Sequence, residues 1–204
     1  MSMDENKSQN AGQSKNQGKI EPVIRKDRQL KYTGTILKIY EDTVIANGHE
    51  AHWDFIHHDG AAAVVAVADD GQLLMVRQYR NALERETLEI PAGCRDSKTE
   101  DTAYCAAREM EEETGYRSTN VKHLLSLRTT VAFCDEAVDI FVATDLEVGT
   151  RHLDEAESID VEIYTLEELC DMIYEGKIQD GKTIAAIMAY AAAKKGGMGK
   201  HLDL

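Results

Sequence analysis

Short apolar runs alternate with turn residues over most of the chain, a pattern typical of a strand-rich protein. Two apolar runs, 61–68 and 73–79, flank Asp69-Asp70-Gly71 and predict a β-hairpin. Similar runs predict further strands within 30–56 and at 87–90, 121–128, 138–143 and 159–164. The spacing of apolar residues at 97–114, 165–175 and 183–194 favours helices.

The order of these elements predicts an α/β sandwich, because strands in succession followed by single helices do not fit regular β-α-β winding. The strands before residue 61, with a turn at Asn47-Gly48, predict a small antiparallel extension. We therefore expect a disordered polar tail at 1–18, a β extension at 19–60, the main domain at 61–195 and a C-terminal tail at 196–204.

Composition narrows the possible partners. The 204 residues carry a formal net charge of -14, with a sequence pI of about 4.9. Nucleic acid and anionic membranes are held by clustered Lys and Arg, so this balance argues against both. No apolar run approaches the roughly 18 residues of a membrane span, and the polar N-terminus does not resemble a signal peptide. We expect a soluble, cytoplasmic protein.

The stretch REMEEETGY, residues 108–116, crowds four glutamates near the end of a predicted helix. Ser97 and Glu100 have capping-box spacing, and Gly115 is placed as a C-terminal stop. At about 100° per residue, one face carries Ala103, Ala107, Met110 and Thr114, and roughly the opposite face carries Glu109, Glu112 and Glu113.

This acidic face has two interpretations. It is either a solvated face of an acidic protein or a site for a divalent cation, because magnesium favours carboxylate oxygens together with water and phosphate. Arg108 lies one turn before Glu112 and is placed to orient it. The cluster alone leaves both interpretations open.

The preceding residues favour the cation site. The segment PAGCRDSKTEDTAYCAAREMEEETGY resembles the signature box of the Nudix hydrolases. The matching residues are Gly93, Glu100, Arg108, Glu109, Met110, Glu112, Glu113, Gly115 and Tyr116. One spacing departs from the box, since six residues instead of five separate Gly93 from Glu100. The extra residue falls in the loop before the helix and leaves the register of the acids unchanged.

The resemblance implies an α/β/α sandwich with a mixed sheet, and hydrolysis of a nucleoside diphosphate derivative with Mg²⁺, or Mn²⁺ as a substitute. It implies that Glu109 and Glu113 are metal ligands, that Glu112 is a ligand or a close catalytic neighbour, and that the carbonyl of Ala92 adds a further bond.

Beyond the box, the run LLMVRQYRNALERETLEIPAG is similar to the ADP-ribose pyrophosphatase branch of this family. This likeness implies that Arg80 contacts the substrate phosphates and that Trp53 and Phe133 bind substrate, Trp53 by stacking on the base. It also implies that Glu157, or failing that Glu155, is the loop acid that acts as metal ligand or base, and that the chain forms a homodimer.

Val131 stands where many members of that branch have a proline in a Pro-Gly turn. The leading expectation is therefore hydrolysis of ADP-ribose to AMP and ribose 5-phosphate, with UDP-, GDP- or ADP-sugars as the alternative substrates. A non-catalytic Nudix module that binds nucleotide metabolites is a further alternative. The retained acids, the acidic charge balance and the lack of spare length for a DNA-binding domain disfavour it.

Overall fold

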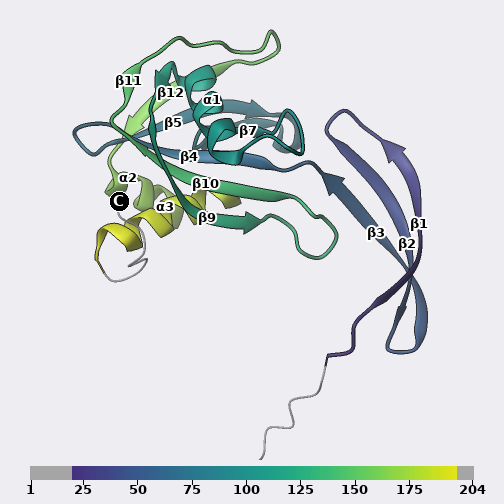
Figure 1. Ribbon diagram of the computed structural model, residues 1–204. Helices are drawn as coiled ribbons and strands as arrows, with labels where there is room; N and C mark the ends of the chain where they lie inside the picture. Colours follow the sequence, from purple (N-terminus) through teal and green to yellow (C-terminus); the bar gives the residue numbers. More distant parts are fainter. Residues whose placement is uncertain (1–19, 197–204) are drawn as a thin grey trace, which may run out of the picture.

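A seven-stranded mixed sheet forms the centre of the protein in the computed structural model, which describes residues 20–196 (Figure 1). The strands are β4 (Ala61–Val67), β5 (Leu73–Arg80), β6 (Arg85–Glu89), β7 (Ala92–Cys94), β9 (Asn120–Arg128), β10 (Ala137–Thr144) and β12 (Ile159–Tyr164). Five of them run in the order β12-β5-β4-β10-β9, while β6 pairs with β5 and β7 pairs with β4. Because β4 and β10 are parallel and the other pairs are antiparallel, the predicted mixed sheet is confirmed.

The α-helices of the described chain cover both faces of this sheet. Helix α1 (Thr102–Thr114) lies on one face, and α2 (Leu166–Tyr174) and α3 (Gly181–Lys194) lie on the other. The side chains of β4 alternate between the two cores, so Val64 belongs to the cluster of Met110 and Val65 to the cluster of Ile187. All four are at most 1% exposed. The predicted α/β/α sandwich is therefore confirmed.

The predicted antiparallel extension is a separate three-stranded sheet of β1 (Ile24–Thr33), β2 (Leu37–Ala46) and β3 (His49–His58). Asn47 (φ 50°) and Gly48 (φ 77°) form the tight turn between β2 and β3, for which positive φ at both positions is required. Strand β1 begins at Ile24, before the predicted residue 30. Its charged start gave no apolar pattern, and its pairing with β2 sets its true length.

In Figure 1 the extension stands beside the sandwich and joins it where β3 leads into β4. The end of β3 also contacts the loop before β10, because the Ile56 amide donates to the Phe133 carbonyl at 2.7 Å and the Asp135 amide to the Ile56 carbonyl at 3.1 Å. The division between residues 60 and 61 stays a prediction. The tail at 1–18 and residues 197–204 of the second tail lie outside the described residues. Within 20–196, no helix has the length and apolar character needed to cross a membrane.

The start of α1 differs from the prediction. Asp101 is the N-cap, and its carboxylate accepts hydrogen bonds from the amides of Ala103 and Tyr104. The Ser97–Glu100 capping box does not form because Glu100 instead accepts from the Asp96 amide at 2.8 Å. These residues belong to the loop before the helix. The predicted stop is confirmed, since Gly115 has φ 77° and donates to the Glu111 carbonyl.

Candidate active site

A cleft of about 890 Å³ lies between the C-terminal half of α1, strands β5 and β7, the start of α3 and the loop before β12. Six of the predicted site residues line it: Arg80, Ala92, Glu109, Glu112, Glu113 and Glu157. The other three lie elsewhere. Trp53 is on the extension and 47% exposed, Phe133 is 48% exposed in the loop before β10, and Glu155 is exposed at a turn.

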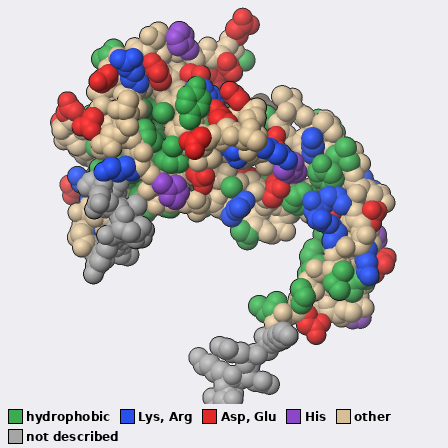
Figure 2. All heavy atoms as spheres, viewed as in Figure 1, with side chains coloured by type: hydrophobic (Ala, Val, Ile, Leu, Met, Phe, Trp, Pro, Cys, Tyr) green, Lys and Arg blue, Asp and Glu red, His purple; other side chains and the backbone are tan. Residues whose placement is uncertain are grey.

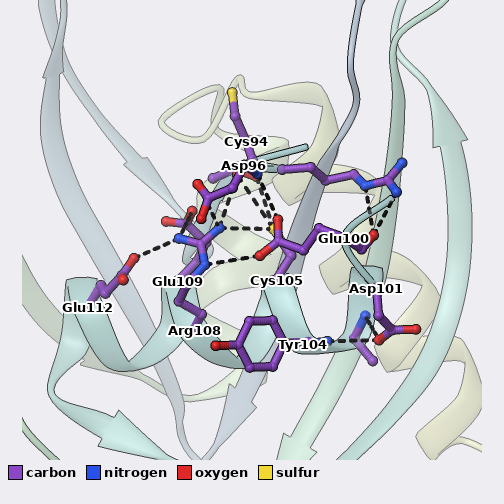
Figure 3. Close-up of polar contacts among 12 residues, drawn as sticks. Cys94, Asp96, Glu100, Asp101, Tyr104, Cys105, Arg108, Glu109 and Glu112 are labelled. Carbon is purple, nitrogen blue, oxygen red and sulfur yellow. Dashed lines mark hydrogen bonds and ion pairs between the residues drawn. The ribbon is translucent and has the colours of Figure 1, made fainter. Parts of the chain in front are cut away.

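Arg108 lies between the carboxylates of α1 (Figure 3). Its Nη1 donates to Glu109 Oε1 at 2.7 Å and to Glu112 Oε2 at 2.8 Å, which confirms the predicted contact one turn along the helix. Its Nε donates to Glu100 Oε1 at 3.3 Å, so the same guanidinium ties the preceding loop to the helix. Arg108 therefore offsets part of the repulsion between like charges on adjacent turns.

Glu113 is buried, with an exposed fraction of 4%, although the sequence grouped it with the acidic face. It follows Met110 by three positions and so borders the apolar face of the helix. The Ala92 amide on β7 donates to Glu113 Oε2 at 3.0 Å. This strand runs beside the helix and supplies a backbone donor that periodicity along α1 cannot reveal. The expected ligand role of the Ala92 carbonyl stays a prediction.

Burial makes the ionised forms of two cleft carboxylates costly. It raises the pKa of Glu109 to about 7, even though Arg108 acts in the opposite direction. It raises the pKa of Glu113 to about 8, with further contributions from the charges of Glu109 and Glu157 and an opposing hydrogen bond from Ala92. The carboxylates are thus close enough to repel one another, and the positive charge around them is too small to keep the pKa of Glu109 and Glu113 at its ordinary value.

A divalent cation suits this environment chemically, since the cleft offers carboxylate oxygens, the donors that magnesium and manganese prefer. The Glu109 carboxylate also lies directly over Gly93, where a Cβ would be 2.0 Å from Glu109 Cδ. Only glycine leaves room for the carboxylate there. Within residues 20–196, however, no three His, Cys, Asp or Glu side chains are already grouped as ligands, and Arg108 instead binds two of the acids.

The opposite wall of the cleft carries the basic side chains Arg80 and Lys182, which belong to a buried ion cluster. Glu89, with a side chain 3% exposed, accepts from Arg80 through two bonds of 2.7 Å and from Lys182 Nζ at 2.5 Å. Thr87 Oγ1 donates to the same carboxylate at 2.6 Å. Burial alone would raise the pKa of Glu89, but the two cations and Thr87 outweigh it and lower the pKa to about 2.

Sequence reasoning identified Arg80 in this cluster but missed Glu89 and Lys182. Lys182 is in the first turn of α3, whose N-cap Asp180 accepts from the Thr183 amide and also pairs with Lys182 at 3.0 Å. Glu89 could have been noticed, because it is the one charged residue in the apolar stretch LEIPAG. Nothing in the sequence pattern links Glu89 to a lysine 93 positions later.

Glu157 reaches the cleft from the loop before β12. Its amide donates to the Asp154 carbonyl at 2.9 Å, and its Oε2 accepts from the Asp154 amide at 3.2 Å. Its charge contributes to the raised pKa of both Glu109 and Glu113, so it faces the acidic end of α1. Of the two candidate loop acids, Glu157 is therefore the one that the fold directs toward the helix.

Comparisons with known proteins agree with this arrangement. The NUDIX domain model matches residues 57–187. An ADP-ribose pyrophosphatase of Bacillus subtilis is 39% identical over 159 residues, covering 76% of this chain and 85% of the relative. A methanol dehydrogenase activator of Bacillus methanolicus is 38% identical with the same coverage. The crystal structure of an ADP compounds hydrolase superposes with a TM-score of 0.78 at 19% identity, covering 87% of this chain and 97% of that one.

The chain belongs to the Nudix hydrolase family, because the domain model covers more than half of it and the relatives align over most of their length. Its sequence is similar to ADP-ribose pyrophosphatases. The solved structure supports the fold independently of sequence, since its identity to this chain is low.

Replacing Glu89 with Gln tests the buried ion cluster. Because the pKa of Glu89 falls from 4.5 to about 2 on folding, its ionised form stabilises the protein above pH 4.5, by about 3 kcal/mol. This contribution is lost as the pH falls from about 4.5 to about 2. We expect urea unfolding at pH 7 to show a loss of about 3 kcal/mol in Glu89→Gln, and the difference from wild type to shrink below pH 4.5.

Glu162→Gln is the matched control, since the Arg77–Glu162 pair also joins two strands but both side chains are about 30% exposed. We expect a loss of about 1 kcal/mol or less there. Equal losses in the two variants, or a Glu89 effect that persists unchanged at pH 2.5, would contradict the assigned role of the cluster.

Proposed function

We propose that this Nudix hydrolase cleaves the diphosphate linkage of ADP-ribose to give AMP and ribose 5-phosphate. The observation that carries the proposal is the polarity of the cleft. Glu109, Glu112, Glu113 and Glu157 face it from one side, and Arg80 and Lys182 from the other. A diphosphate needs cationic partners along its length. One wall supplies Arg80, and the acids of the other wall would hold a divalent cation.

Arg80 binds the diphosphate from the basic wall. Its side chain is 40% exposed and only Nε and Nη2 bond to Glu89, so Nη1 remains available as a donor. Glu89 fixes the orientation of Arg80. Lys182 pairs with both Glu89 and Asp180, so the charges of the cluster balance, and the donors that Arg80 keeps free make the contact to the substrate.

The acidic wall binds and orients the nucleophile. Bound Mg²⁺ or Mn²⁺, held by Glu109, Glu113, Glu112, Glu157 and the Ala92 carbonyl, would neutralise the diphosphate and lower the pKa of a water molecule. Glu157, which is exposed and mounted on a loop, accepts the proton of the attacking water. Glu112, which accepts a hydrogen bond from Arg108, assists as a ligand or as a second acceptor.

Removing one acid of α1 should remove activity and leave the fold intact. We expect Glu112→Gln or Glu113→Gln to lower magnesium-dependent hydrolysis of ADP-ribose by at least about 10²-fold, since each loses a charge that balances the cation. A phosphatase added to the assay releases phosphate from the products AMP and ribose 5-phosphate, and this phosphate measures the rate. Circular dichroism checks the fold. Glu167→Gln, an exposed acid of α2, is the control. Full activity in both α1 variants would refute the proposed site.

A panel of nucleoside diphosphate compounds tests the substrate. ADP-ribose, UDP-glucose, GDP-mannose and ADP-glucose are incubated with the protein and Mg²⁺, and the products are separated by chromatography. We expect the fastest release of AMP from ADP-ribose. Val131 in place of the usual proline makes nucleotide sugars the second candidate, and faster hydrolysis of a UDP- or GDP-sugar would select it. No hydrolysis across the panel would favour the non-catalytic module.

We also propose that the chain is a homodimer formed through the extension, with Trp53 and Phe133 contacting the substrate base. Figure 2 shows hydrophobic side chains spread along the extension, and Ile24, Leu30 and Tyr32 of β1 are each more than half exposed. Exposed apolar surface of this kind marks interaction sites. Trp53 lies outside the cleft of its own chain, so a contact with the base requires the second copy.

Sedimentation of the purified protein tests the dimer. We expect twice the chain mass at micromolar concentration, and a shift to the monomer in Leu30→Asp, because the charge would be buried in the interface. Lys31→Asp, on the same strand and next in sequence, is the control for a charge change alone. A wild-type protein that sediments as a monomer would refute the interface.

A further inference from the structure

The loop between β11 (Glu147–Val148) and β12 is bonded to the C-terminal end of α1. The last four carbonyl groups of a helix have no partner within it. Here the His152 amide donates to the Glu112 carbonyl at 3.1 Å, and Arg151 Nε donates to the Glu113 carbonyl at 2.7 Å. The loop thus satisfies carbonyl groups of the same two residues whose side chains face the cleft.

Arg151 makes a second contact at the other end of the loop. Its Nη2 donates to the carbonyl of Ile159, the first residue of β12. One guanidinium therefore joins the end of α1 to the start of β12, and the loop, which arches past α1 in Figure 1, is closed across its base. The Gly149 amide, which donates to the Gly115 carbonyl at 2.7 Å, strengthens the attachment at the near end.

The closed segment between Arg151 and Ile159 carries the acid that reaches the cleft. Within it, Asp154 and Glu157 bond to each other through main chain and side chain. Most of the loop side chains are exposed, so apolar packing does little to hold the loop in one conformation. The bonds of Arg151 and of the loop amides of Gly149 and His152 tie this segment to α1 and β12.

We propose that Arg151 is a positioning residue that closes this loop and holds Glu157 toward the acidic face of α1. The proposal rests on the proposed function, because Glu157 is given its catalytic role there. Arginine is suited to the task, since its planar fork donates to two carbonyl groups at once, which a lysine ammonium on a single stem cannot do with the same geometry. Its charge also favours the negative end of the helix dipole.

Two measurements on Arg151→Ala and Arg151→Lys test the proposal. The first is amide hydrogen exchange of residues 149–159 in the metal-free protein. We expect exchange about tenfold faster in Arg151→Ala and an intermediate rate in Arg151→Lys. Arg117→Ala is the control, because Arg117 pairs with Glu147 beside the same loop but the two side chains are 59% and 70% exposed. It should match the wild type.

The second measurement is steady-state hydrolysis of ADP-ribose with Mg²⁺. We expect kcat to fall about tenfold or more in Arg151→Ala with KM changed less than about twofold, since the acid and not the phosphate contact is misplaced. In a Glu157→Gln background, Arg151→Ala should cause no further loss of kcat. This non-additivity would not arise if Arg151 only stabilised the fold.

Unchanged loop exchange in Arg151→Ala would overturn the proposal. Faster exchange with kcat losses that multiply in the double variant would also overturn it, because Arg151 would then act independently of Glu157. Wild-type protein that hydrolyses no compound refutes the proposed function instead. In that case the exchange data alone decide whether Arg151 closes the loop, since they require neither metal nor substrate.

Discussion

The concentration of carboxylates at the end of α1 is the constraint on which the site depends. Glu109, Glu112 and Glu113 lie within two turns, and the negative end of the helix dipole adds to their potential. Burial weakens the screening of these charges by water. Such an arrangement persists only if the surrounding structure supplies positive charge or hydrogen-bond donors at several points.

The helix itself and two neighbouring segments supply such charges and donors. Arg108 bridges two of the acids from within the helix, the Ala92 amide on β7 supports the buried Glu113, and Arg151 binds the Glu113 carbonyl. These partners do not complete the compensation, because the pKa of Glu109 still rises to about 7 and that of Glu113 to about 8. The remaining imbalance is the electrostatic reason why a cation suits the cleft.

The sequence predicted those features of the fold and the site that depend on residues close to one another along the chain. Turn residues predicted the stop at Gly115 and the hairpin at 69–71, helical spacing predicted the Arg108–Glu112 contact, and the structure confirms all three. The Ala92–Glu113 bond, the Glu89–Lys182 pair and the Arg151 contacts were not predictable this way. They join segments that are distant in sequence and meet only after the sheet has formed.

Val131, the position at which the sequence departs from many ADP-ribose pyrophosphatases, lies away from the acids of α1. Val131 is 84% exposed and lies outside the cleft, in the loop whose Phe133 carbonyl accepts from Ile56 of the extension. A proline there would restrict the backbone of this loop and so the junction between extension and sandwich. The acids of α1 and the Arg80 cluster belong to the sandwich alone. The proline position of related proteins therefore bears on the junction between extension and sandwich, and the acids and the Arg80 cluster of the proposed site lie apart from it.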